Sequence, residues 1–288
     1  MDHIVIILLQ LAVTIANLAL ICAGLAIIFG MMRVINFAHG EFLMLGGYAA
    51  IVSSRAGVNL WLAMFVVAPT VVGAIGIVLE RLVIRHLYGR MIDTMLATWG
   101  ISLALIGLVT VIFGNTVSGI SPPLGSLAVG QYAIGLYELF LVAVVIGLYG
   151  GGWLVLRRTS FGLLARGTMQ NRVMAAALGV DPGRVYSITF AIGAAVTGLA
   201  GALISPITGV VPTIGAAYIA KAFITVISGG TAIIAGALAA STLLGSINTL
   251  FSFAFSPVLG EVALLAAAVL LLRLLPQGIT GRFFRRSL

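Results

Sequence analysis

The sequence has few charged residues. Only 8% of its 288 residues are Asp, Glu, Lys or Arg, whereas 61% are hydrophobic and the mean hydropathy is +1.24. A soluble globular domain carries about 25% charged residues, because polar groups must cover its surface. The composition therefore excludes a soluble domain. The apolar runs are also long and continuous, which excludes a membrane β-barrel, whose strands alternate apolar and polar side chains.

Cysteine and lysine occur once each, as Cys22 and Lys221. A single cysteine cannot form an internal disulfide. The phosphate-binding motif G-x-x-x-x-G-K-[ST] is missing, because the one lysine lacks its glycine frame. The three histidines, His3, His39 and His86, are far apart in the sequence, and no serine lies in a G-x-S-x-G frame. We therefore expect no catalytic residue, metal site or cofactor in this chain, which argues against an intramembrane enzyme.

Apolar runs recur along the whole chain, and a helix of about 20 such residues crosses the hydrocarbon core. The charge-free stretch 185–220 would be about 54 Å long as one helix, so it must break, and Pro206 and Pro212 predict where. Gly, Asn and Pro residues predict a loop over 114–123. We expect an all-α, polytopic transmembrane helical bundle of about eight or nine membrane segments, some broken or re-entrant. The expected segments are 4–30, 37–53, 58–79, 95–113, 134–156, 185–205, 214–227, 231–250 and 257–272.

The basic residues gather between the apolar runs. The chain has 15 Lys and Arg against 7 Asp and Glu. Arg81, Arg85 and Arg90 form one cluster, 157–184 holds a second and the C-terminal tail a third. Because cytoplasmic loops are enriched in Lys and Arg, we expect all three clusters in the cytoplasm. The N-terminus then faces outside if 37–53 crosses the membrane, and inside if that segment is re-entrant. No basic stripe is interleaved with aromatic residues, so nucleic-acid binding is not expected.

The segment 157–184 predicts a short helix followed by a new membrane span. A helix-forming run, 172–178, follows Asn171, and Gly179 supplies a stop. The Asp-Pro pair at 181–182 then predicts the N-cap and first residue of the next helix. A short apolar helix in a cytoplasmic loop has two uses. It could rest on lipid headgroups, or it could insert into a groove of a cytosolic partner.

Several blocks of the sequence resemble the permeases of bacterial ABC importers, and those for branched-chain amino acids and for urea and short amides in particular. The blocks agree in order and spacing through nearly the whole chain. They are 36–46, 96–100, 158–162, 170–180, 189–193, 200–201, 221–223 and 276–278. Many members of this family carry a Glu where this sequence has Val173 or Met174, so the docking contact is expected to be more apolar.

The resemblance implies a single transmembrane permease domain over 1–288 in the bacterial inner membrane, of the first-permease-subunit type, with 157–184 as its cytoplasmic coupling loop. Its implied partners are a second homologous permease in a heterodimer, two cytosolic ATPases that bind ATP and Mg, a periplasmic substrate-binding protein and membrane lipid. Its implied cargo is a branched-chain or hydrophobic amino acid, or urea or a short amide. The blocks 96–100 and 170–179 resemble the urea and amide branch more. The residues expected to couple to the ATPase are Asn171, Arg172, Val173, Met174, Ala175, Ala176, Leu178 and Gly179.

Asn36, His39 and Glu41 are the first candidates for a translocation path or gate. A charge near the middle of the membrane costs roughly 2.5–3.5 kcal/mol on insertion scales, so Glu41 needs a reason to be there. It either lines a pore at a broken helix or sits at the cytoplasmic edge with Arg33. Because His39 and Glu41 are two residues apart, they are not expected to face each other on a helix.

Thr213, Tyr218 and Lys221 are the second set of candidates for the path. They lie in a Pro- and Gly-interrupted apolar stretch, and such stretches in transporters often mark the substrate site. The Lys221 ammonium is expected either to pair with a carboxylate, of which Glu41 is one candidate, or to snorkel to an interface.

A secondary transporter or channel for a small polar solute is the alternative function. It predicts acidic relays inside the spans and no cytosolic docking helix. The available acids are Glu41, Glu138 and Glu261, and each is near the end of an expected segment.

Overall fold

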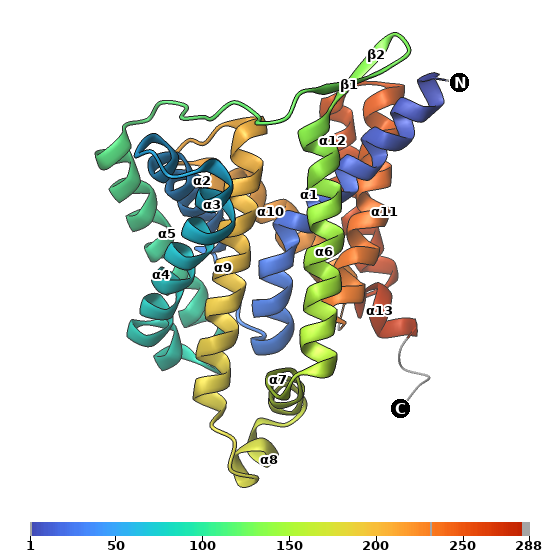
Figure 1. Cartoon of the computed structure of the whole chain (residues 1–288). Coiled ribbons are helices and arrows are strands. Elements are labelled where there is room, and N and C mark those ends of the chain that lie inside the picture. The colour runs from blue at the N-terminus through green and yellow to red at the C-terminus, as the bar shows by residue number, and fades with distance from the viewer. Residues whose placement is uncertain (1, 231, 284–288) are drawn as a thin grey trace. The chain divides into compact units, whose positions relative to one another are not determined.

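The computed structural model describes residues 2–230 and 232–283. Seven of its helical segments are long and apolar enough to cross a membrane (Figure 1). They are α1 (Asp2–Met32), the segment Leu60–Leu82, α5 (Met91–Phe113), α6 (Leu136–Arg158), α9 (Pro182–Thr208), α11 (Ile233–Ala254) and α12 (Pro257–Leu274). Two shorter helices, α2 (His39–Arg55) and the apolar α10 (Ile214–Gly229), account for the other expected segments. The predicted polytopic helical bundle is therefore confirmed.

The segment Leu60–Leu82 contains a wide turn. It consists of α3 (Leu60–Leu62), the π-helical turn η1 (Ala63–Val67) and α4 (Ala68–Leu82). Pro69 lies at the start of α4. Proline has no backbone N–H for the preceding turn, and its ring crowds the carbonyl four residues earlier, so a wider turn relieves both problems.

The break after α9 falls later than expected. The sequence predicted an end at Ser205, next to Pro206, but the helix continues and ends at Gly209, whose φ is +68°. Proline cannot donate to the carbonyl of Ala202. The Ser205 hydroxyl donates to that oxygen instead, at 2.8 Å, so the helix survives the proline by one more turn.

A β-hairpin was not predicted. Strands β1 (Ser126–Val129) and β2 (Tyr132–Gly135) pair antiparallel around a two-residue turn that begins with Gly130, whose φ is +61°. The hairpin leads directly into α6, and that helix ends at Arg158, just before the cytoplasmic segment. A helix of 23 residues is about 33 Å long, so the hairpin and Arg158 lie at opposite ends of a membrane-spanning helix.

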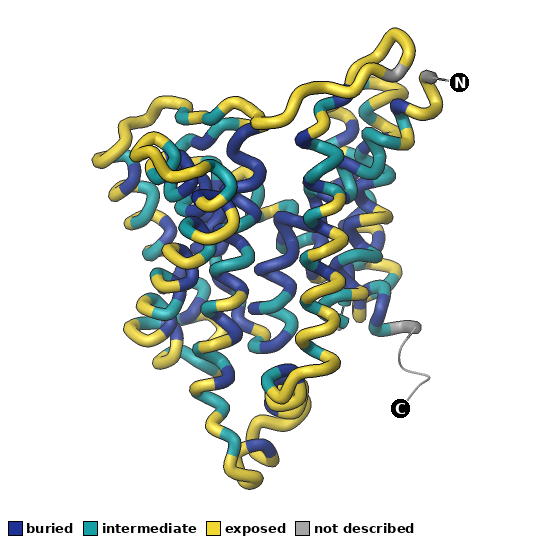
Figure 2. The backbone as a smooth tube through the Cα atoms, viewed as in Figure 1, coloured by how far each residue is buried: buried dark blue, intermediate teal, exposed yellow. Residues whose placement is uncertain are grey.

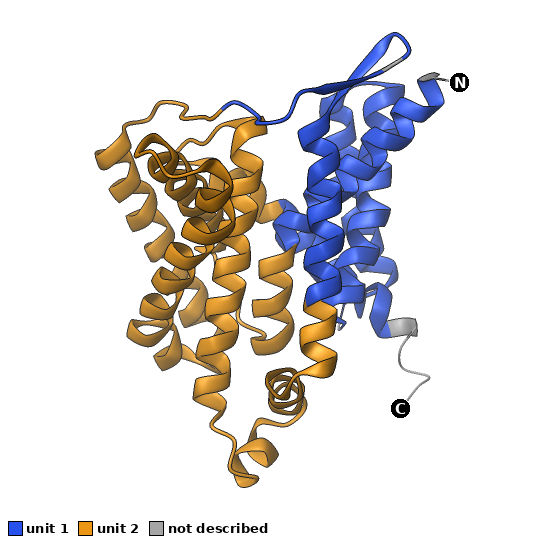
Figure 3. Ribbon diagram, in the orientation of Figure 1, with its two compact units in different colours: residues 1–22, 121–151, 221–288 blue, residues 23–120, 152–220 orange. Residues whose placement is uncertain are grey.

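The described chain divides into two compact units (Figure 3). Unit 1 takes its residues from 1–22, 121–151 and 221–288, and unit 2 is formed by 23–120 and 152–220. Helices α1, α6 and α10 are continuous and contribute to both units.

Close helix contacts at glycines of α9 hold unit 2 together. A Cβ added to Gly201 would clash with the carbonyl oxygen of Leu43 in α2. A Cβ on Gly198 would lie 2.6 Å from Cβ of Val72 in α4. Only glycine allows such approaches, and in lipid they replace the hydrophobic effect as the source of packing energy.

Unit 1 is fastened by backbone contacts and hydroxyl groups. The Tyr149 hydroxyl of α6 donates to the carbonyl of Ala19 in α1 at 2.8 Å. Helix α13 (Gly278–Phe283) closes onto the turn between α10 and α11. There the Thr280 hydroxyl donates to the Gly229 carbonyl at 2.6 Å and accepts from the N–H of Ala232 at 3.2 Å.

Candidate docking segment and translocation path

One end of unit 2 is rich in arginine. Helix α4 is followed there by the 3-10 turn η2 (Ile84–Leu87), and α5 and α9 begin there. The ring centroids of Tyr88, before α5, and Tyr186, near the start of α9, are 5.2 Å apart, which shows that these helix ends lie together. At the other end the residues after α5 and α9 form a bridge between Ser118 and Val210. The arginines at or near the first end include Arg33, Arg81, Arg85, Arg90, Arg172 and Arg184. By the positive-inside rule this end faces the cytoplasm.

The stretch from Arg33 to the end of α2 runs along the length of α5, as expected for a crossing segment and not for a re-entrant one. Arg33 lies in one cavity with Met91, the first residue of α5. Glu41 reaches Ser102, about 16 Å further along α5, and the Tyr48 ring stacks on Phe113 at the far end of that helix, 4.7 Å between centroids. Residues 33–38 form the non-helical entry to α2. This arrangement favours the alternative in which the start of α1 faces outside.

Glu41 lies deep in the membrane. The Ser102 hydroxyl donates to its Oε1 at 2.8 Å, and Ser102 stands about halfway along α5. The residue is 2% exposed, and its Oε2 has no hydrogen-bond partner within the described part of the chain. Of the two alternatives for Glu41, this position favours a place inside the bundle over one at the edge beside Arg33, because the entry 33–38 carries the chain inward before α2 begins.

His39 and Asn36 are buried beside Glu41 but point to other partners. His39 is 2% exposed, and its Nε2 lies 3.3 Å from the Thr197 hydroxyl of α9. That hydroxyl also donates to the Gly193 carbonyl at 2.8 Å, and it can accept from Nε2 in the tautomer that carries the proton there. The ring atom Nδ1 and the Asn36 amide nitrogen have no hydrogen-bond partner in the ranges described. His39 and Glu41 thus face different helices, as expected.

The start of α10 packs against the start of α2. A Cβ added to Gly215 would lie 2.5 Å from the carbonyl carbon of Gly40 and 2.6 Å from Oε2 of Glu41. The structure therefore brings Glu41 close to the beginning of the helix that holds Tyr218. Thr213, in the turn before α10, is exposed, and Tyr218 is half-buried.

Lys221 does not pair with Glu41. It lies in unit 1, where its Nζ is 2.6 Å from Oε2 of Glu261 in α12. The two side chains are 27% and 44% exposed. The candidate partner Glu41 was wrong because sequence does not show which of the acidic residues lies opposite the middle of α10.

The cytoplasmic segment folds as the caps predicted. Asn171 accepts from the N–H of Met174 at 2.9 Å and begins α8 (Arg172–Ala177). Gly179 has a φ of +85°, and the Asp181 carboxylate accepts from two N–H groups at the start of α9. A further helix, α7 (Ser160–Gln170), precedes α8 and was not predicted, although Thr159 is a readable N-cap that accepts from Gly162 at 3.1 Å.

Most residues of α8 are exposed, and the segment is drawn mainly in yellow in Figure 2. They include large apolar ones. Val173 is 80% exposed, Met174 57% and Leu178 78%. Ala175 is only 7% exposed, so it lies on the side of α8 that faces the rest of the chain. All of the predicted coupling residues except Ala175 are exposed and could reach a partner, namely Asn171, Arg172, Val173, Met174, Ala176, Leu178 and Gly179.

A buried network at the cytoplasmic end was missed by the sequence analysis. The Glu80 carboxylate in α4 is 1% exposed and accepts from the Tyr88 hydroxyl at 2.6 Å and the Ser187 hydroxyl at 2.5 Å. Burial, together with the hydrogen bond to Glu80 and its charge, raises the pKa of Tyr88 well above its usual range, so the hydroxyl remains a donor. The Tyr186 ring, which meets Tyr88, also lies 5.5 Å below the guanidinium of Arg172 in α8. The network thus connects α8 with α4.

The described part of the chain has no cluster of metal ligands. No three His, Cys, Asp or Glu side chains there gather closely enough to hold a metal ion.

Comparison with known proteins identifies a family that matches this chain. The profile of one family, the permease component of branched-chain amino acid transport systems, matches residues 7–275. A comparison with solved structures found no match.

Curated relatives match over nearly their whole length. The high-affinity branched-chain amino acid transport system permease protein LivH of Escherichia coli K12 is 31% identical over 285 residues, with 92% of this chain and 91% of the relative covered. The corresponding protein BraD of Pseudomonas aeruginosa is 29% identical over 287 residues, with 92% and 91% covered. A probable LivH of Methanocaldococcus jannaschii is 29% identical over 280 residues, with 92% and 88% covered.

Proposed function

Because the chain belongs to the family of permease components of branched-chain amino acid transport systems, we propose that it forms half of the translocation pathway of an ATP-driven importer for branched-chain amino acids. It is a multi-pass protein of the inner membrane. A second, homologous permease completes the pathway as a heterodimer. Two cytosolic ATPases bind ATP and Mg, and a periplasmic binding protein delivers the cargo.

The observation that carries this proposal is the exposed apolar surface of α8. Val173, Met174 and Leu178 stand out from a short helix at the arginine-rich, cytoplasmic end of unit 2. Large apolar side chains gathered on so small a helix favour a partner surface that covers them. A helix laid into a groove is a recurrent mode of such recognition. The face of α8 is therefore the proposed docking contact with the ATPase.

The buried polar groups at the start of α2 support a role in the path. Buried polar atoms nearly always have hydrogen-bond partners, so those that lack one require an explanation. Asn36, His39 and Glu41 each carry one such atom near the middle of unit 2, where Glu41 adjoins the beginning of α10. We assign these groups to the gate that meets water or cargo when the pathway opens. Thr213, Tyr218 and Lys221 are proposed to line its continuation along α10.

The cargo is proposed from the relatives. Each of the relatives described above is named for branched-chain amino acids, and the family is described in the same terms. Urea or a short amide, which two sequence blocks favour by resemblance, is the competing cargo. An uptake assay that offers each compound in turn compares it with leucine directly.

Charge placed on α8 tests the docking contact. We expect Val173→Asp or Leu178→Asp to abolish co-purification of the ATPase after mild solubilisation, while the permease itself stays folded. Leu127→Asp is the matched control, because Leu127 is also exposed, at 43%, but lies in the hairpin at the far end of α6. Ala175 is unsuitable for this test, because a charge at that buried position would unseat α8. Retention of the ATPase by both α8 variants would mean that α8 rests on lipid instead.

A further inference from the structure

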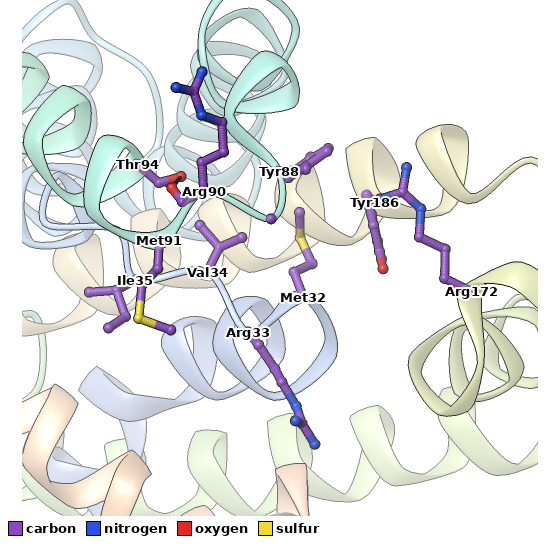
Figure 4. A pocket seen from close by; sticks show the side chains of 11 residues that line it. Met32, Arg33, Val34, Ile35, Tyr88, Arg90, Met91, Thr94, Arg172 and Tyr186 are labelled. Atoms are coloured by element: carbon purple, nitrogen blue, oxygen red, sulfur yellow. Dashed lines mark hydrogen bonds between the residues drawn. The ribbon is translucent and has the colours of Figure 1, made fainter.

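A cavity of about 260 Å³ opens beside α8 at the cytoplasmic end of unit 2 (Figure 4). Four separate parts of the unit form its walls. They are the linker after α1, the residues between η2 and α5, the first residue of α8, and Tyr186 near the start of α9. Tyr88 and Tyr186 belong to the buried network that ends at Glu80, so part of the wall is held firmly in place.

The wall of this cavity is basic. It includes Arg33, Arg90 and Arg172, and no acidic residue lines it. Arg90 is partly neutralised by Asp93 at 2.7 Å. Arg172 lies over the Tyr186 ring, and no ion pair of Arg33 or Arg172 occurs among the residues the structure describes. Clefts lined by charge of one sign concentrate the field and attract groups of the opposite sign.

Arg33 occupies a backbone conformation that costs energy. Its φ is +52°, and it is the one non-glycine residue with a positive φ in the described ranges. It ends α1 with a hydrogen bond of 2.9 Å from its N–H to the Phe29 carbonyl. Glycine usually fills this position at the end of a helix, because a side chain crowds the backbone in this conformation. An arginine in its place indicates that the guanidinium is used.

The arrangement of the arginines indicates what kind of group binds. They enter from different sides, and their guanidinium groups point away from one another toward the surroundings (Figure 4). A single small anion or one lipid headgroup could not contact them together. A protein surface laid across the opening can reach them with separate carboxylates.

We propose that an acidic surface of the ATPase subunit lies across the opening of this cavity, with carboxylates that pair with Arg172 and Arg33. The inference rests on the proposed docking of α8 and extends it. Arg172 is adjacent in sequence to Val173, so a partner that covers the apolar face of α8 also reaches the opening of the cavity. The contact is charge-assisted and bidentate, the geometry that arginine and carboxylate favour.

The scarcity of lysine gives a direct test. Lys221 is the only lysine of the chain and lies in α10, so Arg172→Lys or Arg33→Lys introduces a single amine at the cavity. A carbodiimide, which joins an amine to a carboxylate without a spacer, is applied to the complex of permease and ATPase. We expect a cross-link between each variant and an Asp or Glu of the ATPase. Arg81→Lys is the control, since Arg81 is exposed in the last turn of α4 and does not line the cavity.

The outcomes separate this inference from the function on which it rests. An ATPase that co-purifies but gives no cross-link at position 172 or 33, or one equally strong at position 81, overturns the acidic contact and leaves the docking of α8 intact. Retention of phospholipid in place of the cross-link would assign the arginines to the membrane. Failure of the wild-type chain to bind any ATPase overturns both proposals.

The salt dependence of the complex provides a second measurement. Arg33→Gln combined with Arg172→Gln is expected to weaken ATPase binding by about tenfold at low salt, because each charge-assisted bond contributes to affinity. The difference from wild type should shrink as salt screens the pairs. Arg81→Gln should bind as wild type does, and an equal loss in that control would contradict the assignment.

Discussion

The Tyr88 hydroxyl and the Glu80 carboxylate form a hydrogen bond of 2.6 Å within the cytoplasmic end of unit 2. Ser187 binds the second oxygen of the same carboxylate at 2.5 Å. Glu80 is almost fully buried, and its two hydroxyl partners come from the loop before α5 and from α9. This carboxylate therefore joins α4, the loop before α5, and α9, close to helix α8.

Removal of one hydroxyl should destabilise this junction. Tyr88→Phe leaves Oε1 of Glu80 buried without a partner, which costs roughly 1–3 kcal/mol, or more for a charged group. Thermal unfolding of the purified chain in detergent is the measurement. Tyr132→Phe is the control, because that ring is exposed in the hairpin, and equal melting temperatures for the two variants would contradict the assigned role.

Helix contact at Gly201 should not tolerate a methyl group. Gly201→Ala places a Cβ against the carbonyl oxygen of Leu43, so the two helices must separate. We expect a loss of stability of about 1–3 kcal/mol, as overpacked cores show. Gly100→Ala, in the interior of α5, is the matched control, because nothing lies within 4 Å of the added Cβ. It should be neutral or slightly stabilising, since alanine favours helix. Equal effects would indicate that the contact is absent.

The membrane segments could be predicted from the sequence because their apolar runs are long and the polar breaks between them distinct. The short helix at Arg172 and the start of α9 were also predictable, since Asn171, Gly179 and Asp181 act locally and each determines its own turn. The hairpin carried a weaker signal, a Gly130 between two four-residue strands, and most of it lies between the predicted loop 114–123 and the span expected from 134.

The depth and partners of the charged residues could not be predicted in the same way. Glu41 is eight residues after Arg33, which suggests the membrane edge, yet the non-helical entry places it beside Ser102 in the middle of α5. The partner of Lys221 is 40 residues away in another helix, and the Glu80 network joins residues up to 107 apart. Such contacts depend on how helices pack, and periodicity along one segment does not specify that.

The position of Glu41 predicts an effect on transport rather than on assembly. Glu41→Gln preserves the shape of the side chain and removes its charge from the middle of the membrane. We expect uptake to fall by about tenfold or more, while the ATPase remains bound. Ser53→Ala is the control, since that hydroxyl donates to the carbonyls of Ala49 and Ala50 in its own helix. Unchanged uptake in Glu41→Gln would exclude this residue from the path.

The ion pair between Lys221 and Glu261 predicts a rescue. Lys221→Met alone leaves a carboxylate, and Glu261→Gln alone leaves an ammonium, without an opposite charge in an apolar environment, so each single variant should lower the amount of folded chain in the membrane. The double variant should recover most of it. Quantification of the membrane-inserted protein by its resistance to protease tests this, and an additive loss in the double variant would contradict the pairing.

Uptake of radiolabelled leucine into proteoliposomes tests the central claim most directly. The vesicles contain this chain with its partner permease and ATPases, and a leucine-loaded binding protein is added on the side of the hairpin. We predict uptake that requires ATP and is lost in Val173→Asp and Leu178→Asp but kept in Leu127→Asp. Uptake driven by an ion gradient without ATP, or unaffected by the α8 variants, would contradict the account.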